Sequence, residues 1–209
     1  MSKSLNMKSV LLFFIVFFWF LVIPTMVSFA STDYPEVIGI DSVRITGDRP
    51  TQWIKTYGGP AEDYANSIQK TSDGGYIVAG HINSFIYGND NAWILKLDSD
   101  GNVQWQKTYD TGTNYYDRAN SIQQTSDGGY IVAGMAGWGR GEAWVLKLDG
   151  NGNVQWQKTY GGANYDVASS IQQTSDGGYI VAGWTDSFGA GNEDVWVLKL
   201  DGDGNVQWQ

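Results

Sequence analysis

Residues 67–80 read SIQKTSDGGYIVAG, and nearly the same segment returns at 121–134 and at 170–183. A second segment, WILKLDSDGNVQW at 93–105, returns at 144–156 and 196–208. The tryptophans at 53, 105, 156 and 208 are 52, 51 and 52 residues apart. Constant segments separated by joints of variable length are typical of a repeat fold.

Each repeat predicts four β-strands. In the first repeat we expect strands at 65–71, 76–80, 92–97 and 103–109. Asp-Gly pairs suit tight hairpins that need positive φ, and Asp73-Gly74 separates the first two strands. Along the third strand Trp93, Leu95 and Leu97 alternate with Ala92, Ile94 and Lys96, so the two sets occupy opposite faces.

A four-stranded antiparallel meander cannot bury both its faces alone, whereas copies stacked side by side bury them against one another. We therefore predict an all-β, β-propeller-type fold with blades at about 61–110, 111–160 and 161–209. A β-solenoid is the alternative, but its coils are shorter and parallel. Residues 51–59, TQWIKTYGG, match only the last strand of a further blade. Since propellers have about four to eight blades, we expect a fragment, an incomplete propeller, or one that closes by self-association.

The first thirty residues resemble a targeting segment. Lys3 and Lys8 precede a run of fourteen apolar residues at 10–23, and Ser28-Phe29-Ala30 offers a cleavage site. This pattern predicts a signal peptide at 1–30 and a secreted or cell-surface protein. An uncleaved membrane anchor at residues 10–27 is the alternative. Residues 31–50 form an N-terminal segment that could add strands to an incomplete blade.

The repeat unit resembles a known family. SIQQTSDGGYIVAG, followed by WVLKLD and GNVQWQKTYGG, is similar to the secreted delta-60 type propeller repeats of bacteria and archaea. The stretch LDSDGNVQW at 97–105 also resembles the quinoprotein-type blade motif, whose Trp docks on the neighbouring blade. This resemblance implies that the docking residues are Trp105, Trp156 and Trp208.

Charge and composition exclude several classes of function. The net charge of −9 disfavours nucleic acid and anionic membrane surfaces as partners, and the absence of cysteine excludes disulfides and thiolate chemistry. The acidic turns offer oxygen ligands at alternate positions, so weak Ca²⁺ sites are one interpretation and plain turns the other. The candidate Ca²⁺ ligands are Asp98, Asp100, Asn102, Asp149, Asn151, Asn153, Asp201, Asp203 and Asn205. We expect no other cofactor.

A second acid recurs in each repeat, at Asp63, Asp117 and Asp166. We interpret these residues as caps of the turn that enters each blade; a ring of carboxylates is the alternative.

The ligand-binding candidates lie in the joints, where the repeats differ. They are Trp138, Arg140, Trp184 and His81, and we expect specificity to reside in the joints around 85–90, 134–141 and 185–193. The sequence contains a single histidine and offers no catalytic residue. We therefore expect a non-catalytic scaffold that binds an extracellular protein or polysaccharide. The alternatives are a sugar-binding, lectin-like propeller and part of a quinoprotein-like oxidoreductase or hydrolase.

Overall fold

The computed structural model describes residues 53–83, 90–112, 116–137 and 139–209. The chain divides into two units, residues 1–32 and 33–209, and every described residue belongs to the second. The predictions for the signal segment and for residues 31–50 therefore lie outside the described residues. Within the described ranges, no helix is long and apolar enough to span a membrane.

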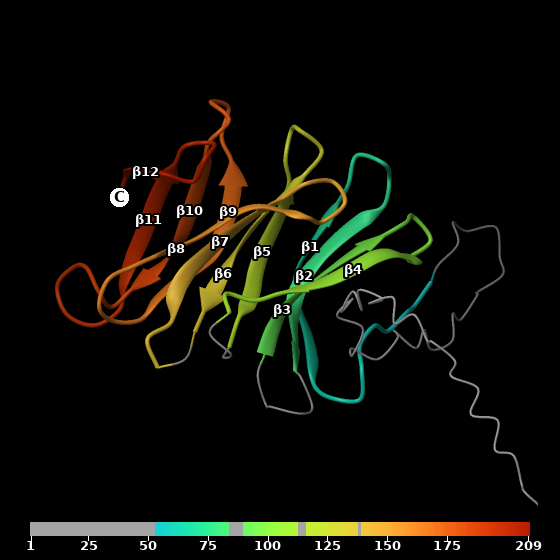
Figure 1. Cartoon of the computed structure of the whole chain (residues 1–209), viewed down its shortest axis with the longest axis horizontal. Helices are drawn as coiled ribbons and strands as arrows, with labels where there is room; N and C mark the ends of the chain where they lie inside the picture. Colours follow the sequence, from blue (N-terminus) through green and yellow to red (C-terminus); the bar gives the residue numbers. More distant parts are fainter. Residues whose placement is uncertain (1–52, 84–89, 113–115, 138) are drawn as a thin grey trace, which may run out of the picture. The chain divides into compact units, whose positions relative to one another are not determined.

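Strands account for all the regular structure in the described part of the chain. They form three separate four-stranded antiparallel sheets, each with its strands in chain order (Figure 1). The first sheet comprises β1 (Asp63–Lys70), β2 (Tyr76–Asn83), β3 (Asp90–Leu97) and β4 (Val103–Tyr109). The second comprises β5 (Arg118–Gln124), β6 (Tyr130–Ala136), β7 (Glu142–Leu148) and β8 (Val154–Tyr160). The third comprises β9 (Asp166–Gln173), β10 (Tyr179–Thr185), β11 (Asp194–Leu200) and β12 (Val206–Trp208).

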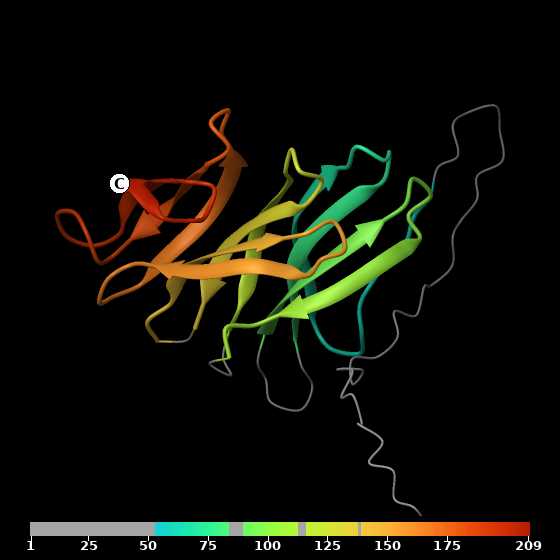
Figure 2. The same ribbon diagram turned by 45° about the horizontal axis from the view of Figure 1, so that its top comes forward.

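This topology confirms the predicted all-β class and the antiparallel blade. The three sheets do not close into a barrel, as expected of an incomplete propeller-type arrangement. Figure 2 shows the sheets following one another in chain order, with the second between the other two.

The first hairpin of each sheet is held by its own polar residues. Asp73 accepts hydrogen bonds from the Thr71 hydroxyl at 2.5 Å and from the Gly75 amide at 3.1 Å. Gly74 has a φ of 87°, in the left-handed region that favours glycine. The same bonds recur at Asp127 and Asp176, so the Ser-Asp-Gly-Gly segments form the predicted tight turns.

A bulge interrupts the first strand of each sheet, which is β1, β5 or β9. The register between β5 and β6 shifts between Ala119 and Ser121, and β1 and β9 show the same irregularity. Opposite the bulge, a Cβ on Gly134 would overlap the backbone carbonyl of Arg118. The glycine that ends each Tyr-Ile-Val-Ala-Gly segment is therefore required by the close approach of two strands.

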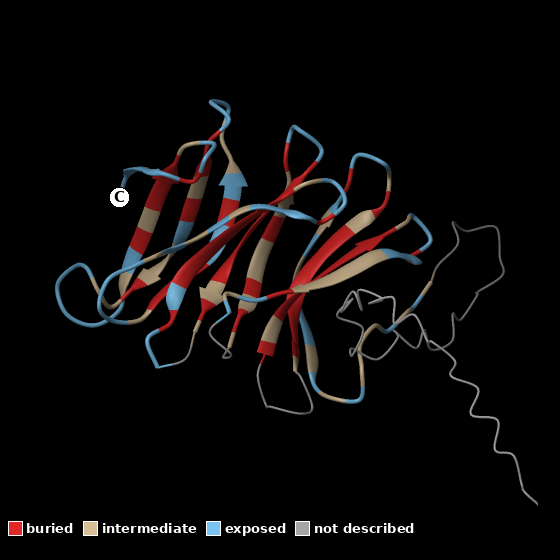
Figure 3. Ribbon diagram, in the orientation of Figure 1, coloured by how far each residue is buried: buried red, intermediate tan, exposed pale blue. Residues whose placement is uncertain are grey.

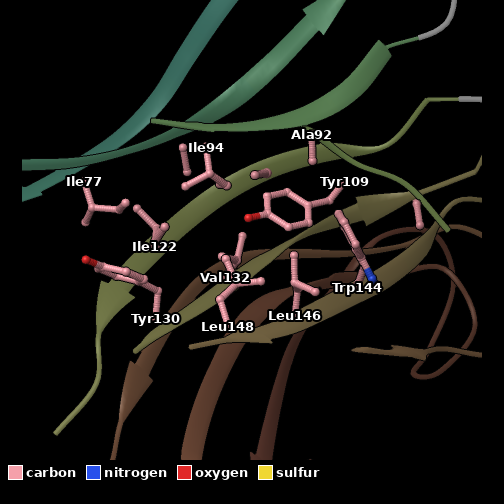
Figure 4. Packing of buried hydrophobic residues seen from close by; sticks show 13 residues of the cluster. Ile77, Ala92, Ile94, Tyr109, Ile122, Tyr130, Val132, Trp144, Leu146 and Leu148 are labelled. Carbon is pink, nitrogen blue, oxygen red and sulfur yellow. The ribbon is translucent and has the colours of Figure 1, made fainter. Parts of the chain in front are cut away.

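The core lies between the sheets. The first junction packs Ile77, Ala79, Ala92 and Ile94 of the first sheet against Ile122, Tyr130, Val132, Trp144, Leu146 and Leu148 of the second (Figure 4). The second junction repeats this arrangement one sheet further along the chain. Trp93, Leu95 and Leu97 lie in a separate cluster, so the predicted alternation of faces along β3 is correct. Figure 3 shows buried residues running along β6 and β7, whereas β10 alternates between buried and more exposed positions.

Candidate functional site

The repeated tryptophans lie against the following sheet wherever one is present. Trp105 packs edge-on against Tyr130, with the ring centroids 5.9 Å apart, and a Cβ on Gly152 would lie 3.0 Å from the indole. Trp156 makes the same contact with Tyr179 at 6.0 Å. Trp208, in contrast, is 53% exposed. Trp105 and Trp156 thus occupy the positions that the family resemblance implied, whereas Trp208 makes no such contact because no described sheet follows the third.

Two further residues of β4 and of β8 bond to the turn of the next sheet. The Lys107 ammonium donates to the Asn153 side chain at 2.8 Å, and the Tyr109 hydroxyl donates to the Gly152 carbonyl at 2.8 Å. Lys158 and Tyr160 repeat these bonds at the third sheet. Sequence reasoning missed this role, although the constant Trp-Gln-Lys-Thr-Tyr spacing was its signal.

The acidic turns are held by internal hydrogen bonds. Asp98 Oδ1 accepts the amides of Asp100 at 2.9 Å and Asn102 at 2.8 Å, while Oδ2 accepts the Asn102 side-chain amide. These bonds, that from the Asn102 side chain above all, lower the pKa of Asp98. The turns that begin at Asp149 and Asp201 have the same bonds. In the described ranges no three His, Cys, Asp or Glu side chains are grouped to hold a metal ion.

The periodic acid at the start of each sheet bonds to the preceding turn. Asp63 Oδ2 accepts the Gly59 amide at 2.6 Å, and Asp166 Oδ2 accepts the Gly162 amide at 2.8 Å. Asp117 is fully buried and accepts the Thr111 amide and hydroxyl, although burial raises its pKa overall. These contacts are those of a turn cap.

The residues that differ between repeats gather at one end of the sheets, where β2, β6 and β10 end and β3, β7 and β11 begin. We call this the variable-loop end. Equivalent positions there hold His81, Met135 and Trp184, because each pairs with the same point of the neighbouring strand. Of the candidate residues, Arg140 is exposed and Trp184 is half-buried, whereas Trp138 lies outside the described residues.

His81 is buried in a polar junction between the first two sheets. Its ring stacks on Tyr64 at 4.8 Å, and its Nε2 lies 3.9 Å from the Asp90 carboxylate. Arg118, on the second sheet, donates from Nε to the same carboxylate at 2.6 Å. Burial lowers the pKa of His81, and the Arg118 charge adds to this effect, so the ring is neutral near pH 7.

Sequence reasoning missed Asp90 and Arg118, because only the fold brings them together. The available signal was a departure from the repeat: Asp90 stands where the other repeats have Gly141 and Glu193. Both acid and histidine are closed to solvent, with exposed fractions of 3% for Asp90 and 7% for His81.

The third sheet carries several accessible aromatic side chains at this end. Trp184 stacks on Tyr165 with the centroids 6.1 Å apart, and Phe188 is 40% exposed. The backbone amide of Asn164 donates to the Ser187 hydroxyl at 3.0 Å, and its side-chain amide donates to the Asp186 carbonyl at 3.1 Å. An aromatic surface with neighbouring amide groups suits contact with a sugar ring or a protein side chain.

Comparison with known proteins assigns no family. No family model matches the sequence, and no curated protein matches it. Among solved structures, the chain is similar to the crystal structure of Sqt1 from Chaetomium thermophilum, with 16% identity and a TM-score of 0.37. The match covers 70% of this chain and 35% of the Sqt1 chain, and it supports no conclusion about ligand or activity.

Proposed function

We propose that this protein is a non-catalytic, secreted or cell-surface scaffold that binds an extracellular polysaccharide or protein through its variable-loop end. One observation carries the proposal. The side chains that recur from repeat to repeat are engaged in turns and in contacts between sheets, as Trp105, Lys107 and Tyr109 illustrate. The positions that vary lie together at the variable-loop end, in and beside the joints that connect the strands.

The chemistry of this end favours polysaccharide as the first ligand to test. The Tyr165–Trp184 pair and the exposed Phe188 provide aromatic surface, while Arg140 and Asn164 provide exposed hydrogen-bond donors. A lectin-like function, with one shallow site per sheet, is contained in this proposal. The enzyme alternatives receive less support, because the titratable groups His81, Asp90 and Arg118 meet inside a junction from which substrate is largely excluded.

The test compares binding of the full chain and its variants to glycan arrays and immobilised polysaccharides. Trp184→Ala and Arg140→Ala should each reduce binding about tenfold or more, as expected for central contact residues. Trp208→Ala is the matched control, because it removes an indole that is 53% exposed at the opposite end of the third sheet. Binding lost equally in all three variants, or in none of them, would contradict the proposed site.

A further inference from the structure

The outer face of the third sheet presents a surface that is buried elsewhere in the molecule. We define it by Ile180, Ala182, Val195 and Val197 on β10 and β11. Their counterparts in the first sheet, Ile77, Ala79, Ala92 and Ile94, are all 0% exposed because the second sheet covers them. Val195 is 87% exposed, and Ala182 is exposed as well. Such a surface is suited to the contact that its counterparts already make.

The strand β1 presents the surface that would receive such a face, because β5 and β9 receive the corresponding faces inside the molecule. Ile68 is 64% exposed, whereas the equivalent Ile122 and Ile171 are 4% and 3% exposed. Within the molecule, β5 and β9 occupy this position and are packed against the three inner strands of the preceding sheet. The outer part of the first sheet is already covered, with Tyr57 packed on Trp93, Leu95 and Leu97 and with Trp53 over Gly101. Among the described residues, the uncovered part of the receiving face is therefore β1.

Hydrogen bonds at the two internal junctions specify the register in which the first strand of one sheet packs against the preceding sheet. Ser67 Oγ accepts the Ile122 amide at 3.4 Å, and Gln69 Oε1 accepts the Gln124 amide at 2.7 Å. Ser121 and Gln123 bond in the same way to Ile171 and Gln173. The next members of the series, Ser170 and Gln172 on β9, are exposed. The amides in the matching receiving positions belong to Ile68 and Lys70.

We propose that the outer face of the third sheet binds β1 of a second copy of this chain, in the register of the internal junctions. The second copy is the occupant because it carries the apolar residues and the amides that this face pairs with twice inside one molecule. The contact is head-to-tail, so it joins copies into a row or a ring. It leaves the variable-loop end free, and several copies held together would bind a repetitive ligand with increased avidity.

One position weakens this contact. Gln124 and Gln173 each use a side-chain oxygen to accept the amide of a serine in the preceding sheet, at 2.8 Å in both cases. Lys70 stands in the equivalent place and has no acceptor atom in its side chain. The amide of Ser175, on the third sheet that receives the β1 of the second copy, would therefore lose this partner. The association is thus weaker than an internal junction, and it can be strengthened by Lys70→Gln.

The test uses single cysteines introduced into a chain that has none. Full-length Ile68→Cys and Val195→Cys chains are treated with a bifunctional thiol cross-linker, separately and mixed. Both positions are exposed, so folding should be retained, and both chains carry the same residues 1–52. A cross-linked pair should form in the mixture and be at least several-fold less abundant in either chain alone. Val154→Cys, exposed to 50% on β8, replaces Val195→Cys as the matched control and should give no pair with Ile68→Cys.

Two results would overturn the proposal. Cross-linking of Val195→Cys with itself would indicate a symmetric contact between two third sheets, and equal yields with the control would indicate no specific contact. In the same assay, Lys70→Gln added to the Ile68→Cys chain should raise the yield several-fold. An unchanged yield would contradict the proposed register.

Discussion

At the scale of single residues, a buried lysine organises each sheet. Lys96 is only 4% exposed, and its ammonium donates to Asp73 at 2.7 Å, to the Leu97 carbonyl at 3.0 Å and to Gln104 at 2.9 Å. Its aliphatic stem fills apolar space while its charge joins the first hairpin to the third and fourth strands. Lys147 and Lys199 make the corresponding bonds to Asp127 and Asp176.

These three Lys–Asp pairs predict that the free energy of unfolding decreases at acid pH. The hydrogen bond from Lys96, with that from Thr71, lowers the pKa of Asp73 to about 2. Asp127 also has its pKa lowered to about 2, by Thr125 and Lys147 against the opposing effect of burial. Because the folded pKa lies below the unfolded value of about 3.9, this stabilisation is complete above about pH 4 and is lost as the pH falls toward 2.

Urea unfolding of the full chain between pH 5 and pH 2 checks this prediction. The triple variant Asp73→Asn, Asp127→Asn and Asp176→Asn should be less stable at pH 5 and show a flatter decline toward pH 2. A decline as steep as that of the unmodified chain would assign the acid sensitivity to other carboxylates.

At the scale of strands, the sequence predicts the outer strand better than the inner ones. The alternation in Val-Gln-Trp-Gln-Lys-Thr-Tyr predicted 103–109, and β4 has these bounds. The predicted 76–80 is shorter than β2, which extends to Asn83 because it pairs with the beginnings of both β1 and β3. The bulge at Asn66 was not predictable, because the pattern of residues does not show which one is left unpaired.

Because β4 packs on the second sheet and β12 does not pack on another described sheet, Trp105 and Trp208 should contribute unequally to the stability of the fold. Trp105→Ala should lower the free energy of unfolding by about 2–4 kcal/mol, because it removes an indole packed between two sheets. Trp208→Ala should cost less than about 1 kcal/mol, since this side chain is largely exposed. Denaturant unfolding measures both values. Equal costs for the two variants would show that the contact between sheets contributes little.

The turns predict the response to calcium. Both carboxylate oxygens of Asp98 already accept hydrogen bonds from the turn, so adding Ca²⁺ or a chelator should leave the unfolding midpoint unchanged. A midpoint that rises with Ca²⁺, and does so no longer in Asp98→Asn, would show instead that the ion displaces these bonds.

At the scale of the molecule, the two junctions share their apolar packing and differ at the variable-loop end. The first contains the Asp90–Arg118 ion pair beside His81, where the second has Gly141, Val167 and Met135. Because the repeats are so similar, a sheet could pack against the wrong neighbour during folding. The ion pair provides a feature that distinguishes one junction from the other. It was not predictable from sequence, since an acid and a base 28 residues apart carry no mark of their contact.

This pair predicts a non-additive response to mutation. Arg118→Leu should destabilise the protein by about 2 kcal/mol, because it leaves the Asp90 carboxylate buried without its partner. The double variant Asp90→Asn, Arg118→Leu should recover most of this loss. A double-mutant cycle of unfolding free energies measures the coupling. Strictly additive values would mean that the two side chains stabilise the fold independently.

The recurrence of one set of contacts at both junctions bears on how such a chain changes length over evolutionary time. A gene duplication that inserted a further copy of residues 111–160 would supply a new sheet whose two faces match neighbours already in place. Unequal recombination between the near-identical segments could therefore add or remove whole units without creating a mismatched interior. The variable-loop end of each unit would then be free to diverge.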